Sequence, residues 1–352
     1  VQSSRLVHTT PPTMIIPPPF VFKVLWSSLS CVGTRRFTQF LGCFPQYKDT
    51  LFYFPPYNMD NDDINQEEEE EYNDNNNNNT NNNTNDDDDD DDHQNPRRRC
   101  LVALTIDDGL CRPSSSTSST TSTSLVPQVL ELLERYNAHA TFFCCTKYTC
   151  YNDNNIIQEA KDIIARGHEI GNHLEEDLSG YYPKLSSEEF GKVLDETNAL
   201  IDQLEDNNNN DKNHSGANDD DDTEDKTQAA AAITTLEEHN HNHNKKKNIR
   251  WFRAPQGILT PTMAKEIQKR NTEKRRRIQH VLGDCYCDDW AIGQSDVKYV
   301  VRTMMKQVQD GSIAILHFPQ KDFRPYCLEI LEQFLQQLCE KKGYQCVSLS
   351  EM

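Results

Sequence analysis

The stretch that decides the fold is "CLVALTIDDG", residues 100–109, an apolar run that ends in two adjacent aspartates. Its Val, Leu, Thr and Ile side chains are typical of a buried β-strand. Polar residues directly after such a strand lie at the edge of a parallel β/α fold where catalytic groups gather. We therefore predict a buried strand over 100–107, with Asp107 and Asp108 at its carboxyl end.

From residue 100 onward, short apolar runs alternate with amphipathic stretches. The predicted strands cover 100–107, 139–145, 168–172, 249–255, 280–284, 312–318 and 344–349. The predicted helices cover 125–136, 155–167, 186–205, 261–270, 297–309 and 325–343. Regular β/α alternation predicts an α/β fold with a mostly parallel sheet covered by helices, and seven units favour a barrel over an open sheet.

Two low-complexity stretches are too polar to bury a core. Residues 60–92 are nearly all Asp, Glu and Asn, and residues 206–247 are Asn, Asp, Ala, His and then Lys. Together, 60–92 and 206–225 hold 24 acidic residues and one basic residue, which account for the net charge of −20. The rest of the chain is nearly neutral, so its charge indicates no nucleic-acid partner and no anionic membrane.

We divide the chain into three parts. Residues 1–58 stay unassigned, although the proline-broken apolar run from Met14 could be a degenerate signal segment. Residues 59–96 are predicted to be a disordered acidic linker, and 97–352 the folded domain with a disordered insertion at 206–248. No apolar run reaches the roughly 18 residues of a membrane span. The compartment is undetermined, with the secretory pathway favoured, and the oligomeric state is undetermined too.

Four motifs at four predicted strand ends resemble those of the polysaccharide deacetylase family, the NodB-homology carbohydrate esterases of family 4. "TIDDG" (105–109) is similar to the family's TFDDG, and "GHEIGNHLEED" (167–177) to its GHEIGNHTxxH. "FRAPQG" (252–257) is similar to RxPxG and "ILHF" (315–318) to LxH. The resemblance covers roughly 100–349 outside the insertions, and it implies a distorted (β/α)7 barrel of the NodB-homology type.

The resemblance also implies a division of catalytic roles. Asp107 would be the general base, Arg253 would pair with its carboxylate, and His317 would be the general acid that protonates the departing amine. Amide hydrolysis needs a nucleophilic water, a Lewis acid for the oxyanion and a proton for a poor leaving group. One carboxylate, one metal ion and one imidazole supply all three.

The implied metal ligands are Asp108 and His173, with Asp177 at the position where the family usually has a second histidine. A carboxylate four residues after His173 reaches the metal if the intervening residues form a helical turn. Two carboxylates and one imidazole neutralise a divalent ion. The pKa of the metal-bound water should therefore be higher than in a site of one aspartate and two histidines, and harder ions such as Mn²⁺ should be favoured over Zn²⁺. We expect one divalent ion, Zn²⁺ or alternatively Mn²⁺ or Co²⁺; the competing interpretation is a weakened or inactive site.

The segment "DCYCDDW", residues 284–290, is two residues longer than the family's D-x-x-D-W. We choose Asp284 as the residue that orients His317, with Asp288 or Asp289 as alternatives. The resemblance implies two substrate contacts, Leu316 in the acetyl pocket and the backbone N–H of Gln256 at the oxyanion, and we predict Trp290 as a wall of that pocket.

These residues predict a metal-dependent deacetylase that acts on a chitin-like or other N-acetylglucosamine glycan. One alternative is a catalytically inactive glycan-binding module, and another is a non-sugar C–N amidohydrolase of the same superfamily. The presence of both Asp107 and His317 favours an enzyme, because a binding module does not need a paired base and acid.

Overall fold

The computed structural model describes residues 34–55, 99–110, 124–147, 154–177, 180–214, 249–273, 277–321 and 324–352. The apolar run from Met14, the whole predicted acidic linker and the predicted insertion beyond His214 lie outside these residues. Within the described ranges, no helix is both long and apolar enough to cross a membrane.

Seven parallel strands form one central sheet in the order β5-β4-β3-β2-β1-β6, with β7 paired to β1. The strands are β1 (Leu101–Gly109), β2 (Thr141–Cys144), β3 (Glu169–Asn172), β4 (Ile249–Phe252), β5 (Arg277–His280), β6 (Ser312–His317) and β7 (Gln345–Val347). β1 is the central strand, because it pairs with β2, β6 and β7. The predicted α/β fold with a parallel sheet is confirmed.

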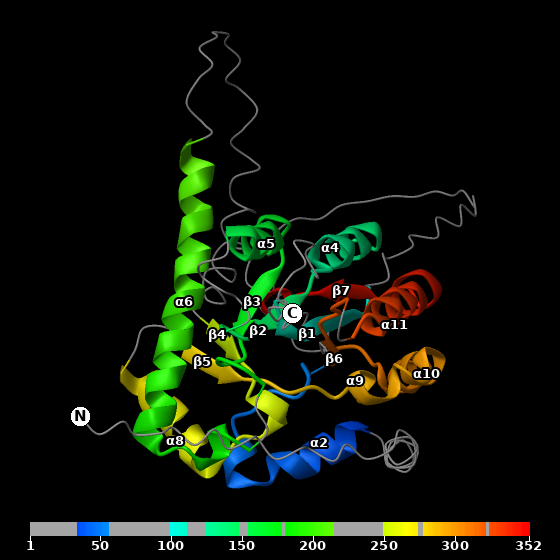
Figure 1. Cartoon of the computed structure of the whole chain (residues 1–352). Coiled ribbons are helices and arrows are strands. Elements are labelled where there is room, and N and C mark those ends of the chain that lie inside the picture. The colour runs from blue at the N-terminus through cyan, green and yellow to red at the C-terminus, as the bar shows by residue number, and fades with distance from the viewer. Residues whose placement is uncertain are drawn as a thin grey trace, which may run out of the picture.

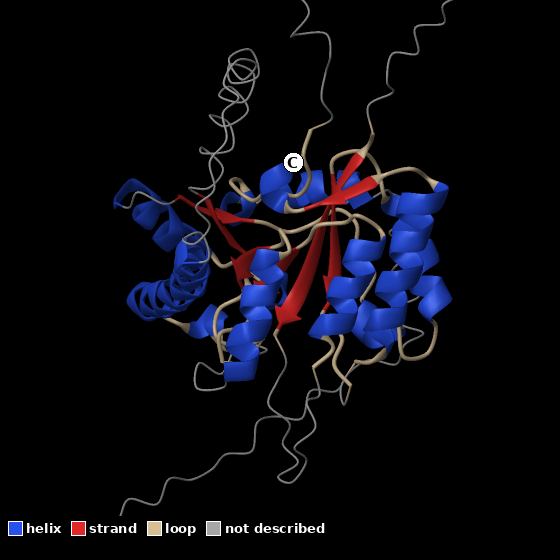
Figure 2. Ribbon diagram, turned by 90° about the horizontal axis from the view of Figure 1, so that it is seen from above, coloured by secondary structure: helices blue, strands red, loops and turns tan. Residues whose placement is uncertain are grey.

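Helices surround this sheet, as Figures 1 and 2 show. They are α4 (Val126–Arg135), α5 (Asn154–Ala165), α6 (Ser187–His214), α8 (Pro261–Glu273), α9 (Asp289–Ile292), α10 (Val297–Gln307) and α11 (Tyr326–Leu335), which continues into a π-helical turn (Gln336–Lys341). In α4, Val126, Val129, Leu130 and Leu133 recur at helical spacing and are buried in the main core.

Side chains of β1 alternate between two cores. Leu104 and Ile106 pack into the core beneath the helices. Ala103 belongs to a separate cluster inside the barrel, with Phe143 of β2 and Trp251 of β4. Because neighbouring strand residues face opposite sides, this alternation separates the residues that hold the helices from those that face the barrel interior.

A segment before the predicted domain fills the gap between β5 and β6. Among the described residues these two strands are not joined by a ladder; Leu51 bridges to Val281 and Tyr53 to Ser312. Beyond β5 the chain reaches β6 directly through one bridge, between Cys285 and Ala314. Helix α2 (Thr34–Gly42) and the 3-10 turn η1 (Pro45–Tyr47) lead into these bridges. Residues 34–54, which the sequence left unassigned, therefore pack on the barrel.

Two elements differ from their predicted positions. The fifth strand ends at His280, whereas the sequence placed it at 280–284. The β4–β5 ladder stops at the pair His280–Phe252, because β4 itself ends at Phe252. Further along the chain, the Leu282 N–H donates to the Leu51 carbonyl and not to β4. Helix α6 runs to His214, nine residues into the segment predicted as a disordered insertion.

Arg250 fastens α6 to the sheet, and its replacement should destabilise the protein. Its side chain is 2% exposed and pairs with Asp202 and, at 2.9 Å, with Glu205 of α6. We expect Arg250→Ala to lower the free energy of unfolding by about 2 kcal/mol, mainly because the packing of the buried aliphatic stem is lost, while the partners Asp202 and Glu205 are 46% and 28% exposed and stay solvated. Urea denaturation measures this change. Arg250→Met, which keeps the aliphatic volume, should lose less; equal losses in both variants would contradict the packing part of this account.

Candidate functional site

A cavity of about 710 Å³ opens at the carboxyl ends of the strands, and it is lined by every predicted site residue except Leu316. Those residues are Asp107, Asp108, His173, Asp177, Arg253, Gln256, Asp284, Trp290 and His317. They come from segments far apart in the sequence, and the strand ends bring them together. A volume of several hundred cubic ångströms is typical of a small-molecule site.

Both aspartates of the first motif line this cavity because the strand is distorted between them. The β1–β2 register shifts between Asp107 and Gly109, and Asp108 has a φ of 61°. Aspartate tolerates this left-handed conformation better than most residues do. The usual alternation of strand side chains is therefore broken, and two adjacent carboxylates reach the same space.

Arg253 fixes the Asp107 carboxylate. Its Nη1 donates to Asp107 Oδ1 at 2.6 Å and to Thr105 Oγ1 at 2.9 Å. Its Nε and Nη2 donate to the carbonyls of Val281 and Leu282 at 3.2 Å and 3.4 Å. Because all three nitrogens are engaged, the guanidinium cannot rotate freely, and the carboxylate is held in one orientation.

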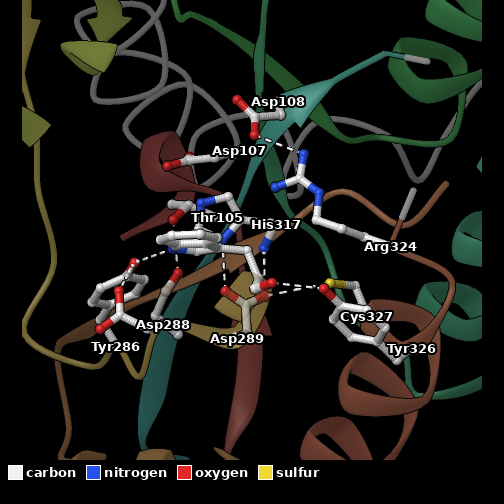
Figure 3. A network of polar contacts seen from close by, with 12 residues as sticks. Thr105, Asp107, Asp108, Tyr286, Asp288, Asp289, His317, Arg324, Tyr326 and Cys327 are labelled. Carbon is white, nitrogen blue, oxygen red and sulfur yellow. Dashed lines mark hydrogen bonds and ion pairs between the residues drawn. The ribbon is translucent and has the colours of Figure 1, made fainter. Parts of the chain in front are cut away.

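His317 forms the second polar pair of the cavity. Its Nδ1 lies 2.6 Å from Asp289 Oδ1, and its backbone N–H donates to Asp289 Oδ2 at 2.8 Å (Figure 3). Burial by itself would lower the pKa of His317, but the charge and hydrogen bond of Asp289 raise it to about 9. The imidazole is therefore protonated at neutral pH, as a general acid must be.

Asp284 does not contact His317, contrary to our prediction. Its carboxylate accepts hydrogen bonds from Arg35 Nε at 2.7 Å and from the backbone N–H of Ile313 at 2.9 Å. Ile313 precedes His317 by four residues on β6, or about 13 Å along a strand. Asp289, one of the two alternatives, takes the place beside His317 because the chain continues past Asp284 into α9.

Leu316 also lies elsewhere than predicted. It is buried in the core beneath the helices, together with Leu104 and Ile106. Since His317 faces the cavity, its strand neighbour must face the opposite side of the sheet. Ile315, two residues before His317, lines the cavity in its place.

His173 and Asp108 face each other with two atoms that can both accept a hydrogen bond or bind a metal ion, His173 Nε2 and Asp108 Oδ1. His173 Nδ1 donates to the carbonyl of Arg253 at 2.8 Å; because a carbonyl can only accept, Nδ1 carries the proton. In the neutral ring, Nε2 is then an acceptor, and it lies 3.6 Å from Asp108 Oδ1. A backbone hydrogen bond on the far nitrogen is the usual way in which a metal-ligating histidine is oriented.

Cys145 and Asp177 are the candidates for a third ligand. Within the described residues, Asp108, Cys145 and His173 form a group whose ligand atoms all lie within 4.8 Å of one another. Asp177 is outside this group, and residues 173–177 form no helical turn. However, Asp177 lines the same cavity and its Oδ1 is buried without a hydrogen-bond partner. Burial and then the Asp108 charge raise the pKa of Asp177.

This donor set fits a divalent cation. Two carboxylates and the Nε2 of an imidazole converge on one cavity, and one buried carboxylate oxygen has no protein donor. A cation would compensate both the unpaired oxygen and the repulsion between Asp108 and Asp177. The adjacent Cys145 could have been anticipated from the sequence, because it directly follows the second strand.

Arg324 is a site residue that no motif indicated. Its Nη2 donates to Asp108 Oδ2 at 2.7 Å, and both side chains are buried (Figure 3). Burial alone would raise the pKa of Asp108, but the charges of Arg324 and then His317 lower it well below its usual range. Asp108 therefore stays ionised, while the guanidinium neutralises part of the charge that would attract a cation.

Comparisons with known proteins place the chain among the polysaccharide deacetylases. Residues 94–273 match the family model described as polysaccharide deacetylase. The chain is 26% identical over 259 residues to the peptidoglycan-N-acetylglucosamine deacetylase of Bacillus cereus, a match that covers 73% of this chain and 90% of that protein.

Two solved structures are similar to this chain at lower sequence identity. The peptidoglycan deacetylase PdaC from Bacillus subtilis is 20% identical, with a TM-score of 0.44 over 72% of this chain and 89% of that one. BA3943 from Bacillus anthracis, a pseudoenzyme of carbohydrate esterase family 4, is 18% identical with a TM-score of 0.46 over 72% of this chain, which spans 65% of its length. The family model, in contrast, matches just over half of the chain, and on that match the chain belongs to the polysaccharide deacetylase family.

Proposed function

We propose that this protein is a metal-dependent deacetylase that hydrolyses the N-acetyl group of a glycan containing N-acetylglucosamine. The observation that carries the proposal is the juxtaposition of a fixed carboxylate and a protonated imidazole: Asp107 lies opposite His317 in the β1–β6 register. The Bacillus cereus relative is named for the same acetamido sugar in peptidoglycan. Chitin-like polymers present the same group, so both are candidate substrates.

In the proposed reaction, Asp107 accepts a proton from the water that attacks the acetyl carbonyl. Its ion pair with Arg253 holds the carboxylate in one orientation toward the cavity. The protonated ring of His317 then donates to the departing amine, and Asp289 stabilises the imidazolium until that step. Gln256, which lines the cavity, would donate its backbone N–H to the developing oxyanion. Trp290, which also lines the cavity, would form one wall of the acetyl pocket.

Asp108, His173 and Asp177 would hold one divalent cation, Zn²⁺ or alternatively Mn²⁺ or Co²⁺. When bound, the cation supplies Lewis-acid chemistry that polarises the acetyl carbonyl. Arg324 occupies Asp108 Oδ2, whereas Oδ1 is the oxygen on the side of His173. Imidazole and carboxylate ligands suit several first-row ions, so these residues do not single out one of the three.

The first prediction concerns the base. The full chain, stripped of metal and resupplied separately with Zn²⁺, Mn²⁺ or Co²⁺, should release acetate from N-acetylglucosamine hexamers. Asp107→Asn should lower kcat at least about 100-fold, because an amide cannot accept the proton of the attacking water. Asp162→Asn, an exposed carboxylate on α5, is the matched control and should keep full activity.

Absence of acetate release with every metal, from a protein with a cooperative melting transition, would contradict the proposed function. Release from small acetanilides but not from sugars would instead support the non-sugar amidohydrolase.

The second prediction concerns pH. The raised pKa of His317 means that its proton is present at neutral pH and is lost as pH rises through about 9. The kcat should therefore fall on the alkaline side. Asp289→Asn removes the charge that raises this pKa, so the alkaline limb should move to lower pH by about one to two units. Asp288→Asn is the control, since Asp288 accepts from Tyr286 rather than from His317. A limb that stays in place in Asp289→Asn would exclude His317 as the titrating acid.

The third prediction separates the two candidate ligands. In calorimetric titrations with Zn²⁺ and Mn²⁺, Asp177→Ala should weaken binding at least about tenfold, because it removes the unpaired carboxylate oxygen. Cys145→Ser should bind nearly as tightly as the unmutated protein, since a neutral thiol is a poor ligand. The reverse pattern would show that the thiol, and not the carboxylate, completes the site.

A further inference from the structure

The segment before the family domain is joined to the barrel by specific backbone contacts. The Leu51 N–H donates to the His280 carbonyl at 3.0 Å, the Leu282 N–H donates to Leu51 at 2.9 Å, and the Phe54 N–H donates to Gly311 at 2.8 Å. Gly311 has a φ of 77°, and a side chain there would collide with the Phe54 carbonyl. Residues 51–54 are thus built into the gap between β5 and β6.

A buried ion pair fixes helix α2 over this gap. Arg35 Nε lies 2.7 Å from Asp284 Oδ2, and the Asp284 side chain is fully buried. Arg35 Nη2 also donates to the Asp310 carbonyl at 2.6 Å, and its guanidinium carbon lies 4.6 Å from the centre of the Tyr53 ring. Since Asp284 does not orient His317, holding α2 is the role that its contacts give it.

The face of α2 toward the barrel is part of the cavity wall. Thr34, Phe37, Thr38 and Leu41 all line the cavity. Their spacing of three, four and seven residues places them on one side of the helix. Phe52, from the segment that follows, lines the same cavity. These residues are mostly apolar, whereas the residues contributed by the strand ends are mostly charged.

This division of the cavity indicates how a substrate would lie in it. The charged strand ends suit the acetamido group, which undergoes the reaction. The pyranose ring of an N-acetylhexosamine also has an apolar C–H surface, and that surface packs well against an aromatic side chain. Phe37 is 40% exposed and can therefore be reached by a ligand.

We propose that α2 is the second wall of the substrate site, and that Phe37 and Leu41 bind the apolar face of the sugar whose acetamido group reaches Asp107 and His317. This proposal rests on the proposed deacetylase function. The family match begins at residue 94, so the wall comes from residues outside the matched region. Sugar binding is accordingly determined in part by a segment that the deacetylase motifs do not include.

Steady-state kinetics of the full chain tests this wall. Phe37→Ala should raise the KM for N-acetylglucosamine hexamer about tenfold and leave kcat unchanged, as expected for loss of an aromatic contact remote from the reacting atoms. Hydrolysis of 4-nitrophenyl acetate, which has no sugar, should not change. Phe40→Ala is the matched control: Phe40 lies on the same helix, is 59% exposed and does not line the cavity.

A second pair of variants tests the anchor of the helix. Arg35→Gln removes the ion pair with Asp284 and should raise the same KM, while Arg36→Gln, an exposed neighbour on α2, should not. Arg35→Gln also leaves Asp284 buried without a cation and should lower the melting temperature, so the kinetics are measured well below the melting transition of each variant. Unchanged ester hydrolysis under those conditions shows that an effect on KM is local. A normal KM for the hexamer in both Phe37→Ala and Arg35→Gln would overturn the proposal.

Failure of the deacetylase function would give a different result. If the unmutated chain releases no acetate, calorimetric binding of the hexamer replaces KM as the readout. Binding that weakens in Phe37→Ala but not in Phe40→Ala would support the wall without the reaction. Absence of binding by the unmutated chain would overturn both proposals, whereas turnover that is insensitive to Phe37→Ala would overturn the wall alone.

Discussion

The site depends on one constraint: two adjacent carboxylates are buried at the end of the central strand, and each requires a positive partner. Asp107 has Arg253, whose other nitrogens are bound to backbone carbonyls. Asp108 has Arg324 and faces the Nε2 of His173. The left-handed backbone at Asp108 makes this arrangement possible, since it turns both carboxylates into one cavity. The cationic partners Arg253 and Arg324 follow β4 and β6, so the site forms only when these later strands have joined the sheet.

Opposite charge environments separate the roles of the residues around that cavity. Positive neighbours keep the pKa of Asp108 low, and Asp289 raises the pKa of His317 to about 9. An ionised Asp108 suits the role of a metal ligand, and a protonated His317 suits the role of the acid that amide hydrolysis needs at neutral pH. Arg324 introduces a competing effect, because a fixed guanidinium on Asp108 and a divalent cation would repel each other. The affinity of this site for metal is therefore a balance between Arg324 and the unpaired oxygen of Asp177.

The sheet itself leaves the opening that the preceding segment covers. Strands β5 and β6 are the two ends of the described ladder, and residues 51–54 bridge them. Through Arg35, the same segment pairs with Asp284, whose carboxylate would otherwise be buried without a cation. Burial raises the pKa of Asp284, and Arg35 with its other hydrogen-bond donors opposes this effect. The barrel and the helix across its gap thus stabilise each other.

The sequence by itself determined the seven β/α units and the strand-end residues Asp107, Asp108, His173, Arg253 and His317 that line the cavity, because these follow from local periodicity and from contiguous motifs. Tertiary structure decided the rest. The fifth strand was misplaced because its pairing depends on β4 and on Leu51. Leu316 was placed in the acetyl pocket on the family motif alone, although the alternation of strand side chains turns it away from the side that His317 faces. The contacts Arg35–Asp284 and Arg324–Asp108 join residues 249 and 216 positions apart. No local pattern specifies such pairs; they form because a folded chain must place a cation beside each buried carboxylate.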